Sequence, residues 1–371
     1  MKILLAAPKI CPPWTEGRKR FVRDLASGFS RHHDVHVVTT AEPGEQPSFA
    51  TDATCVPASG GFSHLSGFHR ALGRCLRTWQ PTWVCHLPIG SFHGHYRYGN
   101  LASLWLADRQ CRIRGLACLT VMYAIAHESS AVELARHVRH LLANDDTAGP
   151  RRIRFGMLLG DSDRPAPAKG RDGKALLFMA GMSEATPERL EHVLSVRGLR
   201  ELLRAGHWLA PAGYRLTLAI PLLESPLLRR CLLEHPDNAW PMPALDFRGI
   251  AAVPAIFSGY DFFVFPYGRE ETAFVPTSVI EAMNAGIACV LPQRHFLSGL
   301  HNAGRTALSY SPGDGESLAR CLLAAAGRDG LIDSLRLEAW NMVQMRYSIE
   351  GTCADLLEYY EQIGAVAGCS H

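Results

Sequence analysis

The sequence lacks several patterns that mark common classes of protein. None of its eleven cysteines forms a C-x-x-C pair, which excludes zinc ribbons and thioredoxin-like redox motifs. The longest apolar stretch, Leu116–Ala126, is far shorter than the ~20 residues that a helix needs to span a bilayer. No apolar segment of signal-peptide type follows a basic start. We therefore expect reduced core thiols and a cytoplasmic location, where any membrane contact is a peripheral one at the bilayer surface.

Motifs for three kinds of cofactor chemistry are also missing. The first apolar run, Ile3–Ala7, is not followed by G-x-G-x-x-G, which excludes a dinucleotide-dependent oxidoreductase. No lysine follows Lys174, so the second half cannot hold pyridoxal phosphate as a Schiff base. No Asp-x-Asp stands between a strand and a loop to suggest a divalent metal. We expect neither a metal nor a cofactor.

Chain length and net charge further restrict the number of domains and the class of binding partner. A chain of 371 residues suits two domains of roughly 150–200 residues each. The formal charge of only +3 argues against a nucleic-acid binder. Residues 1–150 hold 16 Lys+Arg against 11 Asp+Glu, whereas the remainder is slightly acidic. The basic half is compatible with a solvated face, with an anionic acceptor or with a membrane surface.

The apolar pattern predicts two successive α/β domains. Strands and amphipathic helices alternate over residues 1–160, stop at a Pro/Gly-rich linker over 161–173, and start again over 174–350. Continuous apolar strands between amphipathic helices indicate parallel sheets covered on both faces. Two doubly wound, Rossmann-like domains of this kind place their ligand sites at the carboxyl ends of the strands, facing each other across a cleft.

The expected elements can be given by range. Strands are predicted at Ile3–Ala7, Val35–Thr39, Trp83–Leu87, Ala117–Ala124, His140–Ala143, Leu176–Ala180, Arg215–Ile220, Phe262–Phe265 and Ala288–Leu291. Helices are predicted at Arg18–Arg31, Phe68–Trp79, Leu199–Arg204, Ser278–Ala285, Leu318–Ala326, Leu331–Tyr347 and Cys353–Ile363. The stretch Ser183–Val196 has no assigned form.

The stretch Tyr260–Pro292 carries the most informative chemical pattern. A strand leads into a loop, and Pro276 then precedes a helix whose first turn exposes the backbone donors of Thr277 and Ser278. The positive end of that helix is a natural seat for a diphosphate. Glu281 follows Thr277 by four residues, one turn along the same face, where its carboxylate can accept hydrogen bonds from ribose hydroxyls. The alternative is an ordinary strand–helix–strand unit with a surface glutamate.

This segment resembles the family-4 glycosyltransferases, which are retaining enzymes of the GT-B fold with two glutamates separated by seven residues. Glu281 matches the second glutamate, and the position of the first is Ala273. In the family the first glutamate contacts the donor sugar. Glu270 and Glu271 lie in the loop just before, and one hypothesis is that one of them, Glu271 by preference, takes over this contact. The other is that the pocket lacks it and accepts a sugar with fewer hydroxyls.

Three other segments extend the resemblance. The opening strand and loop end at Gly17, which the family uses to bring backbone close to the donor phosphates. The stretch Tyr123–Glu128 is similar to the family's strand that ends in a histidine at the cleft, here His127. In Arg197–Leu203, which is similar to the family's Lys-Gly helix, Arg197 replaces the lysine that neutralises the leaving diphosphate. The resemblance also implies that the closing helix, 353–363, packs back on the first domain.

Candidate acceptor contacts lie in two loops of the first half. His93, His95 and Tyr96 follow the carboxyl end of a strand, where an acceptor would bind. The H-x-H pair lacks a third metal ligand, so a polar loop is the favoured interpretation. Trp14, beside Arg18, is either another acceptor contact or a packing residue.

The resemblance implies transfer of a sugar from a nucleotide-diphosphate sugar to a hydroxyl of a small molecule, glycan or lipid-linked acceptor, with retention of configuration. It implies no metal, no cofactor and no nucleic-acid partner. The alternative is a catalytically inactive, glycosyltransferase-like protein that binds a nucleotide or sugar or serves as a partner subunit. Ala273 and Met182, which replace two polar residues of the family, favour this alternative, whereas Arg197 and Glu281 favour the enzyme.

Overall fold

The structure is a computed structural model of the whole chain. It describes residues 1–11, 17–41, 49, 51–57, 62–88, 97–122, 138–144, 152–153, 156–157, 159, 165, 173–180, 186–220, 225–242, 244–248, 256–257, 259–267, 276–328 and 330–368. The chain divides into two compact units, one of Met1–Leu158 with Arg346–His371 and one of Leu159–Glu270 with Val275–Met345. The predicted linker, 161–173, lies almost wholly outside the described residues, so its boundaries stay a prediction.

The first unit is built on a parallel sheet of seven described strands. Their spatial order is β3 (Asp52–Pro57), β2 (Asp34–Ala41), β1 (Lys2–Ala6), β4 (Trp83–His86), β5 (Cys118–Met122), β6 (His140–Asn144) and β7 (Arg152–Ile153). The order reverses between β1 and β4, which is the topological switch point of a doubly wound sheet.

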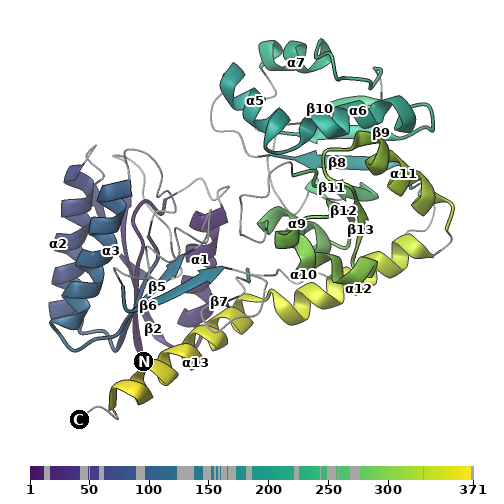
Figure 1. Cartoon of the computed structure of the whole chain (residues 1–371). Helices are drawn as coiled ribbons and strands as arrows, with labels where there is room; N and C mark the ends of the chain where they lie inside the picture. The colour runs from purple at the N-terminus through teal and green to yellow at the C-terminus, as the bar shows by residue number, and fades with distance from the viewer. Residues whose placement is uncertain are drawn as a thin grey trace. The chain divides into compact units, whose positions relative to one another are not determined.

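Helices cover both faces of this sheet, as Figure 1 shows. Residues of β1 alternate between the two faces: Ile3 and Leu5 pack with α1 (Gly17–Ser30) and α13 (Ile349–Gly368). Leu4 and Ala6 pack with α2 (Phe62–Thr78) and α3 (Arg97–Arg112). The strands are therefore buried on both sides, which explains why their sequences are apolar throughout.

The second unit repeats the plan with a parallel sheet of six described strands. Their order is β10 (Leu245–Arg248), β9 (Arg215–Ala219), β8 (Ala175–Met179), β11 (Phe262–Val264), β12 (Ala288–Pro292) and β13 (Ala307–Tyr310). Its switch point lies between β8 and β11. The prediction of two doubly wound parallel sheets is confirmed.

Two helical layers enclose the second sheet (Figure 1). One apolar cluster joins the strands to α5 (Pro187–Ser195), α6 (Leu199–Leu209), α7 (Pro226–Leu233) and α11 (Gly315–Ala326). The other layer holds α9 (Thr277–Asn284), α10 (Ser298–His301) and α12 (Leu331–Arg346), with the 3-10 turns η2 (His295–Leu297) and η3 (Asn302–Gly304) nearby. Gln344 of α12 donates to the Asn284 side chain at 2.6 Å, which fixes the end of α9.

The elements that the sequence pattern does not predict have weak patterns for physical reasons. The edge strands β3 and β10 are largely exposed, so neither has a continuous apolar run. Helix α3 buries small residues, Ala107 and Cys111, which give little contrast with its outer face. The unassigned stretch 183–196 contains α5, which begins at Pro187 behind a Thr186 cap.

Candidate functional site

The candidate site lies at the carboxyl edge of the second sheet, at its switch point. Helices α5 and α6 follow β8 on one side of this point, and α9 follows β11 on the other. In open parallel sheets, ligands bind outside the carboxyl ends of the strands where the strand order reverses. The ends of these strands and helices therefore decide what the site can hold.

A glycine fixes the start of α6 against the end of β11. Gly198 is the residue before the helix and has a left-handed backbone, with φ of 73°. A Cβ at this position would lie 1.6 Å from the carbonyl oxygen of Pro266. No side chain fits, so the close backbone approach requires glycine. This contact holds the preceding residue, Arg197, beside the residues that follow β11.

An aromatic ladder supports the Arg197 guanidinium. The guanidinium carbon lies 5.4 Å from the ring centre of Tyr267, a cation–π contact. Tyr267 is buried and stacks on Phe265 at 5.5 Å, while Phe296 meets it edge-on at 5.8 Å. The Nε atom of Arg197 is buried, and no hydrogen-bond acceptor reaches it among the residues that the structure describes. Within the described residues, Arg197 thus offers a positively charged donor without an acceptor at the carboxyl edge of the second sheet.

Helix α6 is also anchored by a buried carboxylate. The Tyr310 hydroxyl, at the end of β13, donates to Glu201 Oε2 at 3.1 Å. Burial raises the pKa of Glu201, and the hydrogen bond from Tyr310 acts in the opposite direction. The bond ties the first turn of α6 to the end of β13. Glu201 is therefore a structural residue of the site.

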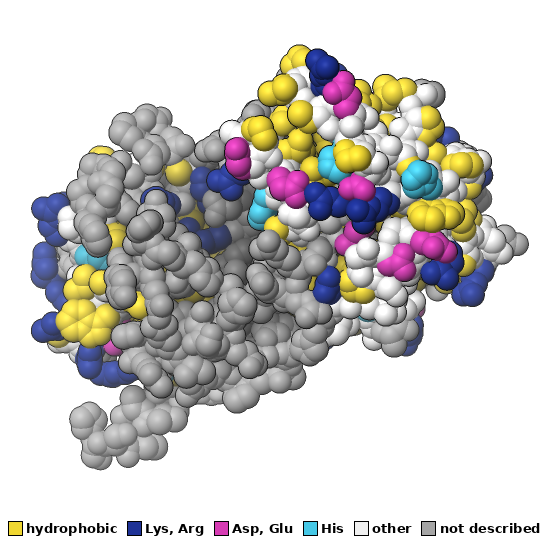
Figure 2. Space-filling model, turned by 45° about the horizontal axis from the view of Figure 1, so that its top comes forward, with side chains coloured by type: hydrophobic (Ala, Val, Ile, Leu, Met, Phe, Trp, Pro, Cys, Tyr) yellow, Lys and Arg dark blue, Asp and Glu magenta, His cyan; other side chains and the backbone are white. Residues whose placement is uncertain are grey.

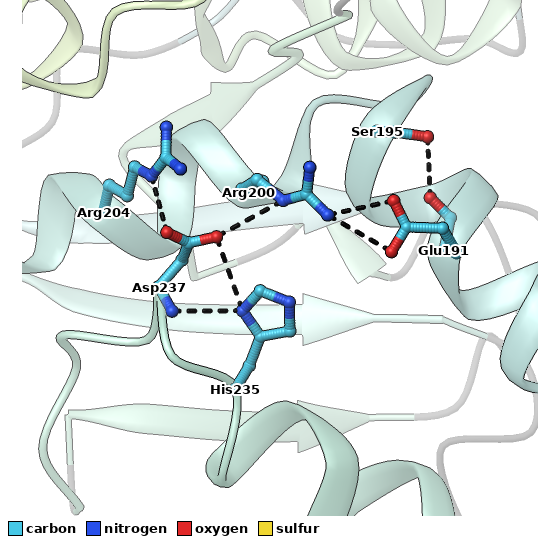
Figure 3. Close-up of polar contacts among 6 residues, drawn as sticks. All are labelled: Glu191, Ser195, Arg200, Arg204, His235 and Asp237. Atoms are coloured by element: carbon cyan, nitrogen blue, oxygen red, sulfur yellow. Dashed lines mark hydrogen bonds and ion pairs between the residues drawn. The ribbon is translucent and has the colours of Figure 1, made fainter.

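An ion-pair network holds the outer side of α6 (Figure 3). Arg200 Nη2 contacts both carboxylate oxygens of Glu191 on α5, at 2.9 and 3.2 Å. Its Nε lies 3.3 Å from Asp237, whose other oxygen accepts from Arg204 at 2.7 Å. The backbone N–H of Asp237 donates to His235. These side chains are partly exposed, so each pair contributes at most about 1 kcal/mol, and the network mainly orients α6 relative to α5.

The start of α9 provides the second half of the site. Pro276 is the residue before the helix, and its carbonyl accepts from Val279 at 3.0 Å and from Ile280 at 3.3 Å. The backbone N–H groups of Thr277 and Ser278 precede these bonds and have no acceptor within the helix. Both residues and Glu281, one turn further on, are half-buried. The geometry suits an anion at the helix tip.

In the first unit, Arg18 joins the chain segments that follow β1 and β4, the two strands at the switch point. Its guanidinium donates to the carbonyls of Pro8, Leu87 and Pro88, each at 2.8 Å, and the side chain is buried. Arg18 lies in the first turn of α1, one residue after Gly17. Three backbone carbonyls therefore hold the charge of Arg18 inside the fold, where it does not serve as a contact for an acceptor.

His86, the last residue of β4, is a second buried polar group at this point. Its side chain is inaccessible to solvent and stacks on Phe68 at 6.3 Å. Neither ring nitrogen has a hydrogen-bond partner among the described residues. Burial, with smaller contributions from the nearby His69 and Arg18, lowers the pKa of His86 to about 3. The folded unit therefore keeps this imidazole neutral.

We expect His86→Leu to stabilise the first unit in acid. The folded pKa of His86 lies below the unfolded value of 6.5, so its favourable contribution is present above pH 6.5 and lost as the pH falls towards 3. Between these pH values, the free energy of unfolding of the wild type should fall by up to about 1.4 kcal/mol more per pH unit than that of the variant. Denaturant unfolding from pH 7 to pH 4 measures this difference, and equal slopes would contradict it.

Six of the predicted site residues lie outside the described residues: Trp14, His93, His95, Tyr96, His127 and Glu271. Gly17 is the first residue of α1, at the carboxyl edge of the first sheet. Arg197, Thr277, Ser278 and Glu281 all belong to the switch-point edge of the second sheet. Sequence reasoning missed Tyr267, although its place just after an apolar strand was a usable signal.

Comparison with known proteins extends the description of the fold. Neither the models of known protein families nor the sequences of curated proteins match this chain. Among solved structures, a glycosyltransferase from Rickettsia africae is similar over 98% of both chains, with a TM-score of 0.71 at 13% identity.

Two further structures agree over nearly the whole length. Sucrose-phosphate synthase from Thermosynechococcus elongatus has a TM-score of 0.70 at 15% identity, over 98% of this chain and 99% of that chain. The Anabaena protein HepE, solved in complex with UDP, has a TM-score of 0.67 at 13% identity, over 100% of both chains. With its two doubly wound parallel sheets, this chain has the GT-B glycosyltransferase fold.

Proposed function

We propose that this protein transfers a sugar from a nucleotide-diphosphate sugar to a hydroxyl acceptor, with retention of configuration. The observation that carries the proposal is Arg197, held on Tyr267 with a buried, unsatisfied Nε at the second switch point. A diphosphate would satisfy this donor. The UDP bound to HepE makes uridine diphosphate the first nucleotide to test.

The donor would be bound by groups of both halves of the site. Arg197 would contact the diphosphate, whose oxygens would also accept from the backbone N–H groups of Thr277 and Ser278. Glu281 would accept hydrogen bonds from the ribose hydroxyls. Gly17 would allow backbone of the first unit to approach the phosphates.

The remaining predicted residues complete the proposal. Glu271 and His127 would contact the donor sugar near the reacting carbon. Trp14, His93, His95 and Tyr96 would contact the acceptor, which is a small molecule, a glycan or a lipid-linked sugar. A lipid-linked acceptor would bring the protein to a membrane surface from the cytoplasmic side. No helix among the described residues is long and apolar enough to cross a membrane.

The chemistry would depend mainly on electrostatics. The bond between the sugar carbon and the diphosphate oxygen breaks as the acceptor oxygen bonds to the same face of that carbon, and the proton of the acceptor hydroxyl passes to the departing diphosphate oxygen. Negative charge then develops on the leaving diphosphate. Arg197 and the positive end of α9 would stabilise this charge more in the transition state than in the ground state. In this scheme the protein supplies the positive charge itself, with no metal or cofactor.

A second function follows from one observation. Ala273 occupies the place of the family's first glutamate, which favours a protein that binds the nucleotide or sugar without turning it over, or a partner subunit. Slow hydrolysis of the donor in the absence of acceptor would identify an enzyme. Tight binding of UDP-sugars with no hydrolysis and no transfer would identify the binding protein.

The first test is Glu281→Ala. Loss of the ribose contact should weaken nucleoside diphosphate binding by about 1–3 kcal/mol, the range for hydrogen bonds to a charged group. Titration calorimetry with UDP, GDP, ADP, CDP and dTDP measures the affinity and identifies the base. Glu234→Ala, an exposed glutamate on the same unit that pairs with Arg230, is the control. Unchanged affinity in folded Glu281→Ala would refute the role of Glu281.

A further inference from the structure

The basic charge of the first half is concentrated in one pair of helices. Residues 62–116, which span α2 and α3, contain seven arginines, no lysine and one acidic residue, Asp108. Residues 1–150 carry a net charge of +5, so this segment accounts for all of the excess. Asp108 is buried, which leaves the arginines to dominate the outer surface.

The two helices present their arginines on one surface. Both pack on the same face of the first sheet, and Gln110 of α3 donates to the His69 carbonyl of α2 at 3.2 Å. Their exposed sides carry stripes at helical spacing, i, i+4 and i+7. The stripes, with one adjoining residue, form what we call the arginine face: Arg70, Arg74, Arg77, Trp105, Arg109, Arg112 and Ile113.

The arginines of α2 have no acidic partners among the residues that the structure describes. Among the described residues, none of Arg70, Arg74 and Arg77 forms an ion pair. On α3, Arg112 lies 3.9 Å from Asp108, at the limit of an ion pair. Elsewhere on the described surface, exposed arginines such as Arg230 and Arg305 pair with glutamates. The arginine face therefore leaves guanidinium groups available for external anions.

Two large apolar side chains lie among these arginines. Trp105 is 40% exposed and Ile113 is 70% exposed, although both belong to a folded helical layer. The Arg109 guanidinium covers the Trp105 ring at 4.8 Å. Figure 2 shows dark-blue basic and yellow apolar side chains next to each other along the left edge of the molecule, over α2 and α3. Exposed tryptophan beside arginine is typical of surfaces that lie at a membrane interface.

We infer that the arginine face binds the surface of a bilayer that contains anionic phospholipids. Guanidinium groups bind lipid phosphates bidentately, while Trp105 and Ile113 enter the boundary between headgroups and acyl chains. The inference gives a location to the membrane contact of the proposed function, but lipid binding does not require sugar transfer. A failure of either leaves the other standing.

A bilayer fits this surface better than a nucleic acid does. A nucleic acid would engage the arginines through phosphates but would leave Ile113 without an apolar partner. The two helices, each about 25 Å long, present an outward surface in which basic and apolar side chains are interspersed. The second half of the sequence has a slight net negative charge, which would repel a nucleic acid that extends beyond the arginine face.

The test is sedimentation of the full chain with vesicles. We expect binding to vesicles of equimolar phosphatidylcholine and phosphatidylglycerol, and none to phosphatidylcholine alone. Each basic residue near an anionic surface contributes about fivefold to binding. The triple variant Arg70→Gln/Arg74→Gln/Arg77→Gln should therefore bind about 100-fold more weakly. At high salt, which screens the charges, the wild type should keep some vesicle binding through its apolar side chains. The double variant Trp105→Ala/Ile113→Ser should lose this remaining binding.

A matched control removes the same charge elsewhere. Arg305→Gln/Arg320→Gln/Arg328→Gln replaces three exposed arginines of the second unit and should bind vesicles as the wild type does. Equal weakening by both triple variants would overturn the inference, as would equal binding to neutral vesicles. Tighter binding of a double-stranded DNA that displaces the protein from vesicles would assign the face to nucleic acid instead. Unchanged melting temperatures show that the variants remain folded.

Discussion

Arg197→Ala is expected to slow sugar transfer by roughly 100- to 1,000-fold while leaving the protein folded. The size follows from the loss of one preorganised charged donor to a developing negative charge. The half-buried side chain lies over the Tyr267 ring, and its Nε has no hydrogen-bond partner within the described parts of the chain, so it contributes little to folding. The measurement is kcat with a saturating nucleotide-sugar donor, together with the melting temperature.

Three companion variants sharpen this result. Arg197→Lys should keep part of the activity, because an ammonium group still neutralises the diphosphate but cannot bind it bidentately. Tyr267→Phe should stay near the wild type, since a phenylalanine ring still supports the guanidinium, whereas Tyr267→Leu should reduce kcat. Normal transfer by Arg197→Ala would show that the charge on the diphosphate is stabilised elsewhere.

Gly198→Ala is expected to destabilise the second unit by at least about 3 kcal/mol. A residue with a side chain is strained at φ of 73°, which costs about 1–2 kcal/mol. The added Cβ would also meet the Pro266 oxygen at 1.6 Å, so the start of α6 must move. That movement would displace Arg197, and activity should fall even where the variant remains folded. Denaturant unfolding measures the loss of stability.

Gly213→Ala measures the cost of backbone strain at a positive φ without a steric clash of the added Cβ. Gly213 also has a positive φ, of 84°, but the nearest atom to an added Cβ is the flexible Lys174 Nζ at 3.5 Å. This variant should lose only about 1–2 kcal/mol and keep its activity. If the two variants lose the same stability, the contact between Gly198 and Pro266 does not determine the position of α6.

Much of the fold could be read from the sequence because it depends on local pattern. Each buried parallel strand, such as Ala288–Pro292, is a continuous apolar run, and each core-facing helix repeats its apolar residues at helical spacing. The stop at Gly286 is also local, because its φ of 71° suits glycine. Edge strands such as Asp52–Pro57 were not predicted, because their exposed side chains do not form a continuous apolar run.

The sequence also located part of the candidate site. Thr277, Ser278 and Glu281 follow from spacing within one helix, which is fixed by helix geometry. The pair Arg197-Gly198 was recognisable as a motif, but the motif gives no reason for the glycine. The reason is the Pro266 carbonyl, 68 positions further along the chain, which the parallel pairing of β8 and β11 brings alongside.

The sequence by itself determined the two alternating α/β series, the polar end of α9 and an excess of positive charge in the first half. Only the tertiary structure decided that Tyr267 supports Arg197, that Arg18 is bound by three carbonyls inside the fold, and that the charge excess forms one surface on α2 and α3. The physical reason is sequence separation: these contacts join segments that are distant in the chain, and their geometry is set by strand order and helix packing.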